Sequence, residues 1–369
     1  MIVYPHSTAA AQPQTNKSRI NKVTAPPPLA CSREWPSRLI DGTEPGRAGI
    51  DALVRRALDL RAGAAPRRAE GRRIASLFLN PSLRTRTSID AACHALGVHC
   101  ITLAPGRDMW GIELEDGVVM NGTAAEHVKD AIAVLEQMVD LLAVRAFAGL
   151  EDQAEDARDP AISAFVRHSK VPVINLESAR WHPMQGLADT AAWKAHLGDD
   201  LRGEKLVLTW APHPKALPQA VANQVLLSAA LQGMDVTVAH PEGFDLDPEV
   251  LARAGTLAQL QGGTVSVSHD QQAAMRGARV VVAKSWSGWS GYGRREDEAR
   301  VRATLGDWQV TPETMAKTDN AGFMHCLPVR RNVVVADAVI DGPNSWAHET
   351  AGLRLWTAIA TLEAMLARN

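Results

Sequence analysis

Residues 73–96 read RIASLFLNPSLRTRTSIDAACHAL, and they predict a buried β-strand, a sharp turn and an α-helix in direct succession. The segment Arg73–Leu79 is apolar enough for a strand that is buried on both faces, and Pro81 and Ser82 end it. Apolar residues then recur at helical spacing over Thr85–Leu96. A fully buried strand that leads into a helix is typical of a parallel sheet covered by helices on both faces.

The same alternation of strands and helices extends along the chain on both sides of this segment. In chain order, the apolar spacing predicts helix Ile50–Leu60, strand His99–Leu103, helix Ala124–Val139, strand Leu141–Arg145, helix Pro160–His168, strand Val171–Leu176, helix Pro183–His196, strand Lys205–Trp210, helix Gln219–Gln232, strand Asp235–Ala239, helix Glu249–Leu260, strands Val265–Ser268, Val280–Ala283 and Phe323–Cys326, and helix Leu353–Leu366. We therefore expect an α/β protein with two domains, each a parallel sheet flanked by helices. A break near residues 177–183 places a cleft between the domains, and this cleft is the predicted active site.

The predicted domains cover residues 37–180 and 181–352, and the C-terminal helix 353–369 is expected to pack back on the first domain. Residues 1–36 stand apart, because they contain three consecutive prolines and no acidic residue before Glu34. This composition cannot build a core, so we expect a disordered tail or a wrongly assigned start of the chain. A transit peptide is the alternative, but arginines are few and no amphipathic period is evident.

The composition is that of a soluble globular protein, with 46% hydrophobic and 22% charged residues. A formal net charge of -2 gives no bulk positive field, so nucleic acid is not an expected partner. No apolar segment is long enough to span a membrane. The four cysteines show neither zinc spacing nor a disulfide framework, which indicates a reducing, cytoplasmic setting without a structural metal.

The turn Asn80–Ser88 has the features of a phosphate site. It lies where a strand ends and a helix begins, and free backbone N–H groups and the helix dipole bind anions at such a point. Ser82 and Thr85 add hydroxyl groups, and Arg84 and Arg86 add guanidinium groups suited to phosphate. The Gly-rich stretch of a Walker loop is missing. The alternative is a capped helix with two solvated arginines.

A second motif, His182–Asp189, places His182 and Gln185 about one helical turn apart, so both side chains can face one ligand. An imidazole and an amide are suited to orienting a neutral carbonyl-amide group. A histidine at a helix start is otherwise a cap or a core residue.

The third motif, His325–Asn332, follows a short strand, and Arg330 within it could reach the cleft. A His-Cys pair suggests a nucleophile. We favour a buried structural role for Cys326, because no separate base and orienting residue accompany it.

Four further candidates follow predicted strands or occupy a loop. Arg145, Glu177 and Lys284 each lie at or just beyond a strand end, and Trp110 lies in a charged loop. Each alone would be a surface or packing residue, but their shared position suggests function. The Gly-rich segment 288–293 could close over a substrate.

Taken together, these motifs resemble the aspartate/ornithine carbamoyltransferase superfamily over nearly the whole chain from about residue 40. The family's Ser-x-Arg-Thr-Arg loop is matched by Ser82–Arg86, its His-Pro-x-Gln element by His182–Gln185, and its His-Cys-Leu-Pro element by His325–Pro328. The resemblance implies a first domain that binds carbamoyl phosphate, a second that binds the amino acid, and a homotrimer whose active sites are shared between subunits.

The chain is most similar to the N-acylornithine branch of that superfamily. The similarity rests on Leu208–Lys215, Ala220–Asn223 and Pro328–Asn332. Ordinary ornithine enzymes carry an Asp-x-x-x-Ser-Met-Gly loop, whereas this chain has Lys284–Gly288 in its place, without the Asp and the Ser-Met-Gly. The loss of that carboxylate is unfavourable for free ornithine, whose α-ammonium needs an anionic partner.

The acyl group is predicted from two positions. Acetyl-type enzymes of the family carry Glu and Lys where this chain has Ala125 and Val334, and His240–Gly243 looks more like the succinyl type. Succinyl-type enzymes tend to have Pro where this chain has Ala125. From these features together, we favour succinylornithine over acetylornithine.

Another departure from the family lies in the C-terminal helix. The family often has Asn before the residue matched by Arg354, where this chain has Leu353.

The resemblance implies a role for each matched residue, and it implies no metal and no cofactor. Carbamoyl phosphate would be bound by Ser82, Leu83, Arg84, Thr85, Arg145, His182, Gln185, Cys326, Leu327, Arg354 and Trp110 of a neighbouring subunit, and the acylated amino acid by Glu177, Lys284, Leu327, Arg330 and Ala125. The catalytic residues among them would be Thr85, Arg145, His182 and Gln185. The implied reaction carries the carbamoyl group to the δ-amine of an N-acylornithine in arginine biosynthesis. Alternatives are an ordinary ornithine carbamoyltransferase and an inactive regulatory relative.

Overall fold

A computed structural model describes residues 35–367 of the chain. Two five-stranded sheets, both parallel, form the centres of two α/β domains. The first sheet has the order β1 (Arg38–Leu39), β7 (Val173–Glu177), β6 (Leu141–Arg145), β2 (Arg73–Phe78) and β3 (His99–Leu103). The second has the order β10 (Thr264–Ser268), β9 (Asp235–Ala239), β8 (Lys205–Trp210), β11 (Val280–Lys284) and β12 (Gly322–Met324). The predicted fold class is confirmed.

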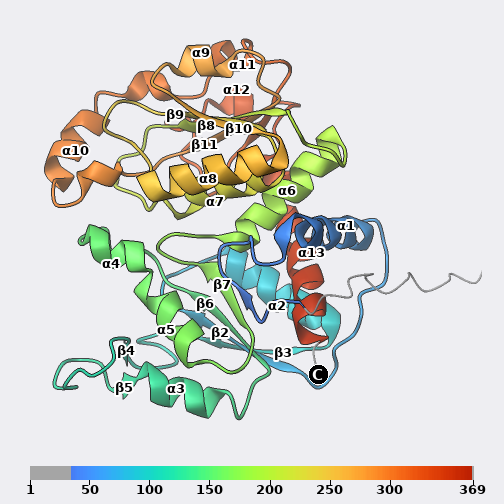
Figure 1. Cartoon of the computed structure of the whole chain (residues 1–369), viewed down its shortest axis with the longest axis vertical. Coiled ribbons are helices and arrows are strands. Elements are labelled where there is room, and N and C mark those ends of the chain that lie inside the picture. The colour runs from blue at the N-terminus through green and yellow to red at the C-terminus, as the bar shows by residue number, and fades with distance from the viewer. Residues whose placement is uncertain (1–34, 368–369) are drawn as a thin grey trace, which may run out of the picture. The chain divides into compact units, whose positions relative to one another are not determined.

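Each sheet is covered by helices, as Figure 1 shows. The helices of the first domain are α1 (Gly46–Arg61), α2 (Arg84–Leu96), α3 (Val128–Leu135), α4 (Gln153–Arg158) and α5 (Pro160–His168). Those of the second are α7 (Ala220–Leu231), α8 (Pro248–Gln261), α9 (Gln271–Met275), α10 (Arg295–Arg302), α11 (Pro312–Met315) and α12 (Asp337–Ile340). Short 3-10 turns η1 (Trp289–Gly291) and η2 (Gly306–Trp308) complete the second domain.

Strand β2 shows why its sheet is covered on both faces. Ile74 and Phe78 belong to one apolar core together with residues of α1 and α2, whereas Ala75 and Leu77 belong to a second core with residues of α3 and α5. Successive side chains of a strand point to opposite faces, so a strand with apolar side chains on both faces needs cover on both sides. The strand therefore stays central, and its carboxyl end opens toward the loop that starts α2.

Helix α13 (Ala347–Leu366) returns to the first domain, where it packs against α1 and α2. A buried ion pair fixes this return, since Arg56 donates to Glu363 from Nε at 2.7 Å and from Nη2 at 2.8 Å. The helix begins before Leu353, the residue at which the sequence pattern placed its start. Arg354 thereby lies inside a regular helix.

One sequence prediction is wrong in part. The helix expected over Ala124–Val139 is shorter, because β5 (Glu126–His127) pairs with β4 (Ile112–Glu113) and α3 starts only at Val128. The His127 side chain accepts a hydrogen bond from the backbone of Lys129 and caps the helix. Pairing with a distant segment thus overrides the local helical pattern.

Two expectations concern the chain as a whole. The prediction for residues 1–36 lies outside the described residues except at its last two positions. No helix within residues 35–367 is long and apolar enough to cross a membrane.

Candidate active site

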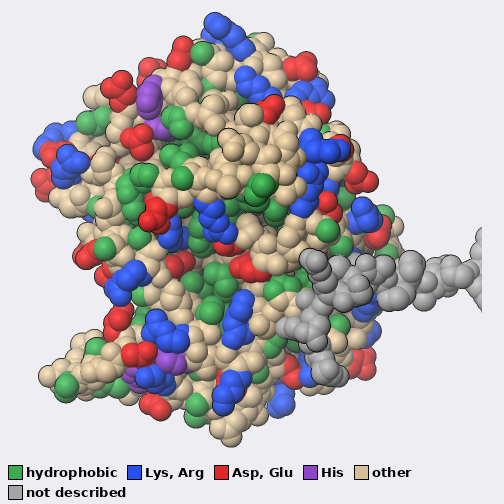
Figure 2. Space-filling view, in the orientation of Figure 1, with side chains coloured by type: hydrophobic (Ala, Val, Ile, Leu, Met, Phe, Trp, Pro, Cys, Tyr) green, Lys and Arg blue, Asp and Glu red, His purple; other side chains and the backbone are tan. Residues whose placement is uncertain are grey.

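A cavity of about 680 Å³ lies between the two domains. It is lined by the residues that follow β2, β6 and β7 in the first domain and by those that follow β8, β11 and β12 in the second. Figure 2 shows a hollow between the two halves with basic and acidic side chains along it. The carboxyl ends of both sheets meet here, as expected for a ligand site of parallel sheets.

The first wall of the cavity is the start of α2. The Ser82 hydroxyl accepts a hydrogen bond of 3.2 Å from the backbone N–H of Thr85, which fixes the turn. Arg84 is half-buried beside it, and burial lowers the pKa of its guanidinium. The Leu83 side chain remains 74% exposed. The first turn of α2 thus presents backbone N–H groups and a cation at one point, an arrangement that binds phosphate.

Two further arginines converge on the Thr85 hydroxyl. Arg354 donates to Thr85 Oγ1 at 2.6 Å from Nη2, and Arg145 approaches the same oxygen at 3.5 Å from Nη1. Arg145 also pairs with Glu177. Burial lowers the pKa of Arg354 to about 10, so it remains charged at neutral pH. Three guanidinium groups against one carboxylate leave this wall positively charged, which favours an anionic ligand.

His182 lies next to this cluster as the residue before α6 (Pro183–Leu197). Its Nε2 is 3.3 Å from Glu177 Oε2 and 3.5 Å from Arg354 Nη2. Burial, together with the charges of Arg354 and Arg145, holds the pKa of His182 well below its usual value. The imidazole is therefore neutral near pH 7, and it can donate an N–H to a carbonyl oxygen without carrying a charge.

Gln185 points into the same cavity from the first turn of α6. Its Nε2 donates to Asp189 Oδ1 at 2.9 Å, while its Oε1 has no hydrogen-bond partner among the described residues. An unpartnered amide oxygen beside a cavity is an acceptor available to a ligand N–H.

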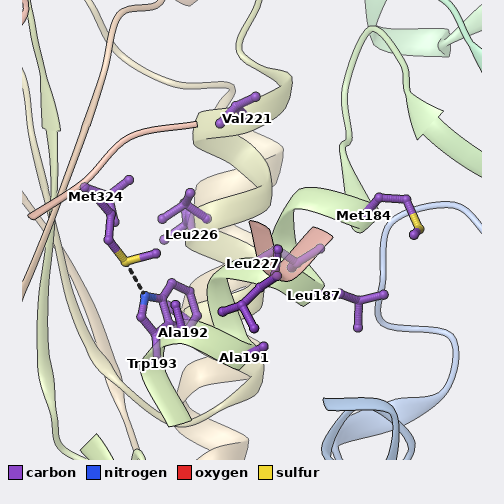
Figure 3. Close-up of a cluster of buried hydrophobic side chains, with 14 of the residues drawn as sticks. Met184, Leu187, Ala191, Ala192, Trp193, Val221, Leu226, Leu227 and Met324 are labelled. Atoms are coloured by element: carbon purple, nitrogen blue, oxygen red, sulfur yellow. Dashed lines mark hydrogen bonds between the residues drawn. The ribbon is translucent and has the colours of Figure 1, made fainter. Parts of the chain in front are cut away.

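The helix that carries His182 and Gln185 is held rigidly. Apolar side chains along α6 pack against α7, and the Trp193 indole N–H lies 3.1 Å from the sulfur of Met324 on β12 (Figure 3). Met184 and Leu187, on the first turns of the same helix, are also buried. Such packing fixes the two polar side chains in place.

The second domain contributes a cation and a shaped turn. Lys284 ends β11, is 9% exposed, and donates from Nζ to the backbone oxygen of Ser285 at 2.8 Å. The turn after β12 holds Leu327 at φ 54°, and its N–H donates to His325 Nδ1 at 2.9 Å. Burial lowers the pKa of His325 to about 3 and raises that of the Cys326 thiol. A thiol held protonated is a poor nucleophile, in agreement with the structural role favoured for this cysteine.

Most of the predicted site residues line this one cavity. They are Ser82, Leu83, Arg84, Thr85, Arg145, Glu177, His182, Gln185, Lys284, Cys326, Leu327 and Arg354. Because they come from segments far apart in the sequence, the fold has brought them together.

Three predicted residues do not line the cavity. Trp110 is 58% exposed and donates from Nε1 to Glu126 at 2.6 Å. Ala125, the residue before Glu126, is exposed as well. Arg330 is exposed too, but its Nε lies 3.1 Å from Nε2 of the cavity residue His213. The first two cannot act in the cavity of their own chain as they stand.

Several lining residues were not predicted as site residues. The Arg145 guanidinium lies 4.3 Å over the ring of Phe147, and Leu217, Pro218 and Val221 line the second-domain side. Phe147 lies just after β6, so the strand-end rule would have found it if it had been extended beyond charged residues. The other three lie around the start of α7, well after the end of β8, and no strand-end signal points to them. No group of three or more potential metal ligands is found among the described residues.

Known proteins match the chain over both domains. Residues 39–195 match the family profile "Aspartate/ornithine carbamoyltransferase, carbamoyl-P binding domain", and residues 218–365 match the "Asp/Orn binding domain" profile. An N-acetylornithine carbamoyltransferase of Xanthomonas campestris pv. campestris is 42% identical over 325 residues, which cover 88% of this chain and 96% of the relative. An N-succinylornithine carbamoyltransferase of Bacteroides fragilis is 37% identical over 290 residues, which cover 79% and 86%.

A solved structure agrees with these relatives. An N-acetyl-L-ornithine transcarbamylase with one glutamate replaced by alanine, complexed with carbamyl phosphate and N-succinyl-L-norvaline, superimposes with a TM-score of 0.87 at 41% identity. The match covers 89% of this chain and 99% of that one. Both the fold and the order of the domains are therefore shared.

Proposed function

Because the chain belongs to the aspartate/ornithine carbamoyltransferase family, we propose that it transfers the carbamoyl group of carbamoyl phosphate to the δ-amine of an N-acylornithine. The products are the N-acylcitrulline and phosphate. The observation that carries the proposal is the convergence of Arg84, Arg145 and Arg354 around Thr85 in a cavity whose opposite wall holds Lys284.

The arginine cluster accounts for the phosphate end of carbamoyl phosphate. The phosphate oxygens would be bound by Ser82, the backbone N–H groups at the start of α2, Arg84 and Arg354, and the lining of the cavity by these residues supports the assignment. Trp110 of a neighbouring subunit completes this part of the site. Charge-assisted hydrogen bonds of this kind are about twice as strong as neutral ones.

We expect the carbamoyl end to lie against hydrogen-bond donors, one of them the charged Arg145, and against one acceptor. Thr85, Arg145 and His182 donate to the carbonyl oxygen, and Gln185 and the backbone at Cys326 and Leu327 hold the NH₂ group. As the neutral δ-amine attacks the carbonyl carbon, negative charge grows on that oxygen. The C–O bond to phosphate then breaks, phosphate leaves with the electron pair, and the proton that the attacking amine loses passes to the departing phosphate. Fixed donors of this type typically contribute about 3–4 kcal/mol each.

The acylated amino acid occupies the second-domain side. Lys284 attracts a carboxylate and repels an α-ammonium, so it favours a substrate whose α-amine is acylated. Leu327, Glu177 and Arg330 complete this part, with Arg330 beside His213 at the edge of the cavity.

We favour N-succinylornithine, with N-acetylornithine second. The relatives of higher identity are acetyl-type enzymes, yet the family's acetyl-type Glu and Lys are replaced here by Ala125 and the buried, cavity-lining Val334. We take the glutamate replaced in the alanine mutant to occupy the Ala125 position. That mutant was complexed with a succinylated ligand, which supports the choice. A small neutral residue leaves room for the longer chain and adds no charge against its carboxylate.

The remaining parts of the proposal concern the setting. We propose a homotrimer with shared active sites, because the exposed Trp110 and Ala125 lack any role in their own chain's cavity. The enzyme would act in the cytoplasm, in arginine biosynthesis, on small-molecule substrates. The reaction as written requires neither a metal nor a cofactor.

Steady-state kinetics with carbamoyl phosphate and, in parallel, succinylornithine, acetylornithine and ornithine test the proposal at one pH. The expected order of kcat/KM is succinylornithine, acetylornithine, ornithine, because an unpaired buried α-ammonium costs several kcal/mol. Ornithine as the best substrate would overturn the N-acyl assignment, and acetylornithine ahead of succinylornithine would overturn only the acyl choice. An intact protein that binds a bisubstrate phosphonate but turns over none of the three would be an inactive relative. The variant Ala125→Glu should shift preference toward acetylornithine.

A further inference from the structure

Asp189 is a buried carboxylate that has no role in the reaction as described so far. It lies one turn after Gln185 on α6, is 3% exposed, and accepts the 2.9 Å hydrogen bond from Gln185 Nε2. Gln185 itself is 2% exposed. Both partners of this contact are therefore shielded from water, where the geometry of a hydrogen bond has its largest effect.

An ionised carboxylate can only accept hydrogen bonds, and this restricts the neighbouring amide. A glutamine side chain can present either its oxygen or its NH₂ group to a given point. With Asp189 ionised, only one of the two orientations is compatible, namely that with the NH₂ group toward Asp189. The Gln185 oxygen, which has no partner among the described residues, is then left for a ligand that donates.

We propose that Asp189 is a positioning residue for carbamoyl transfer, which fixes the Gln185 amide with its oxygen toward the NH₂ group of the carbamoyl moiety. The inference rests on the proposed function, because it takes Gln185 to be the residue that holds this NH₂ group. The opposite orientation would set the Gln185 NH₂ group against the ligand NH₂ group, and neither can accept.

The surroundings of Asp189 make its charge sensitive to pH. Burial raises its pKa to about 7, against the hydrogen bond from Gln185 and the charge of Arg354 on α13, which lower it. Arg354 stays charged near neutral pH. The Cys326 thiol stays protonated, because burial raises its pKa and the negative charge of Asp189 raises it further. Glu177 on β7 is paired with Arg145, and α7 contributes neutral amides to α6. Below about pH 7, a protonated Asp189 can donate to the Gln185 oxygen and release the restriction.

If Asp189 served only to stabilise the fold, its replacement should lower the thermal midpoint, whereas we expect no such loss. Because its pKa in the folded protein is raised above the usual 3.8, the native state holds the proton more tightly than the unfolded chain does. Folding stability from this group is greatest below about pH 4 and is lost as the pH rises to about 7. At pH 8 the ionised Asp189 therefore opposes folding, and Asp189→Asn should leave the thermal midpoint unchanged or higher.

The test uses full-length protein and two stable probes, phosphonoacetamide, which carries a carboxamide NH₂ group, and inorganic phosphate, which carries none. The ratio of their dissociation constants isolates the carboxamide contacts from the phosphate contacts. At pH 8.5, Asp189→Asn should weaken phosphonoacetamide binding relative to phosphate by about three- to tenfold, the value of one lost hydrogen bond. In the wild type, phosphonoacetamide binding should weaken relative to phosphate by a similar factor as the pH is lowered through about 7. In the variant, the ratio of the two dissociation constants should change with pH only as far as the ionisation of the two ligands requires.

Three controls separate positioning from general damage. Thr190→Val alters the next residue of α6, whose hydroxyl donates to the Gly186 backbone oxygen, and should leave the ratio as in wild type. In a Gln185→Leu background, Asp189→Asn should add no further loss. Asp189→Leu, which cannot hold the amide at all, should lose at least as much as Asp189→Asn.

The inference is overturned if Asp189→Asn binds both probes like the wild type while the wild type turns over its substrates. It is also overturned if the loss persists in the Gln185→Leu background, or if it follows a lowered thermal midpoint. Failure of the proposed function is a different result, in which the wild type shows no preference for the carboxamide and no carbamoyl transfer.

Discussion

Replacement of Arg354 by methionine removes a cation that is buried in the ligand-free protein without a carboxylate in contact. Arg354 is 5% exposed, its Nε has no partner among the described residues, and none of their ion pairs includes it. Its contacts are the 2.6 Å hydrogen bond to Thr85 and the 3.5 Å approach to His182. Methionine fills much of the same space with an apolar side chain, so the variant removes mainly charge.

The size of the effect follows from the pKa. Burial lowers the pKa of Arg354 from 12.5 to about 10, so the folded protein disfavours the charged form at all lower pH. At about 1.4 kcal/mol for each pKa unit, the cost of the charge is roughly 3 kcal/mol. The hydrogen bond lost with Thr85 offsets about 1 kcal/mol. We expect the ligand-free variant to be more stable by up to about 2 kcal/mol, or about 3 °C in thermal midpoint.

Phosphate binding should change in the opposite direction. A guanidinium group that bonds to phosphate contributes about 1.5–3 kcal/mol, so the variant should bind inorganic phosphate about 10- to 100-fold more weakly. Thermal unfolding without ligand and calorimetric titration with phosphate measure the two effects. Arg354 thus lowers the free energy of unfolding of the ligand-free wild type and raises its affinity for phosphate.

Arg56→Met is the matched control. Arg56 is buried to the same degree, at 4% exposed, but it makes two hydrogen bonds to Glu363. Its removal takes two guanidinium hydrogen bonds from the buried Glu363 carboxylate, which still accepts one from the Arg67 backbone N–H at 2.7 Å. The loss should cost up to about 3–5 kcal/mol and should not alter phosphate affinity. If Arg354→Met loses stability as Arg56→Met does, or binds phosphate like the wild type, the assignment of Arg354 to the ligand is wrong.

Further predictions concern activity. Arg84→Ala should abolish turnover with the fold intact by circular dichroism, and activity within about threefold of wild type would remove Arg84 from the phosphate site. Inactive Trp110→Ala chains mixed with inactive Arg84→Ala chains should regain activity in hybrid trimers, whereas a fully active monomer at high dilution would contradict shared sites. Tyr292→Phe deletes the 2.9 Å hydrogen bond from the segment before α10 to Asp156 of the first domain, and should raise KM for the amino acid about three- to tenfold; unchanged kinetics would exclude a closing role. Because the pKa of His182 lies well below its usual value, pH profiles of kcat between pH 6 and 9 should show no inflection that His182→Gln removes.

The parts of the fold that the sequence predicts are those set by neighbours in the chain. The strand, turn and helix of residues 73–96 follow from apolar spacing and from Pro81, and the structure has β2 and α2 there. The same local rules failed at Glu126–His127, which pair with Ile112–Glu113 as a short parallel bridge. The partner of such a pair lies outside any local window, so its register cannot be obtained from periodicity.

The site residues fall into the same two groups, those that their local position in the sequence indicates and those that only the tertiary fold brings together. Strand-end position indicated Arg145, Glu177 and Lys284, because parallel strands gather their carboxyl ends at one edge. The contact of Arg354 with Thr85 spans 269 residues of sequence, and only the resemblance to a family pointed to it. No chemical pattern around Asp189 distinguished it from a packed helix residue, since its significance depends on which way the Gln185 amide faces.

One positive field serves three steps of the proposed reaction. Arg84, Arg145 and Arg354 attract the phosphate group, and the charges of the last two add to burial in lowering the pKa of His182 and keeping it neutral. A neutral imidazole can donate to the developing oxyanion without giving up its proton, whereas an imidazolium would also repel the ammonium form of the substrate δ-amine. The same field lowers the pKa of any ammonium group that enters the cavity. The substrate δ-amine therefore loses its proton more readily inside the site than in water, and a neutral amine is the form that attacks.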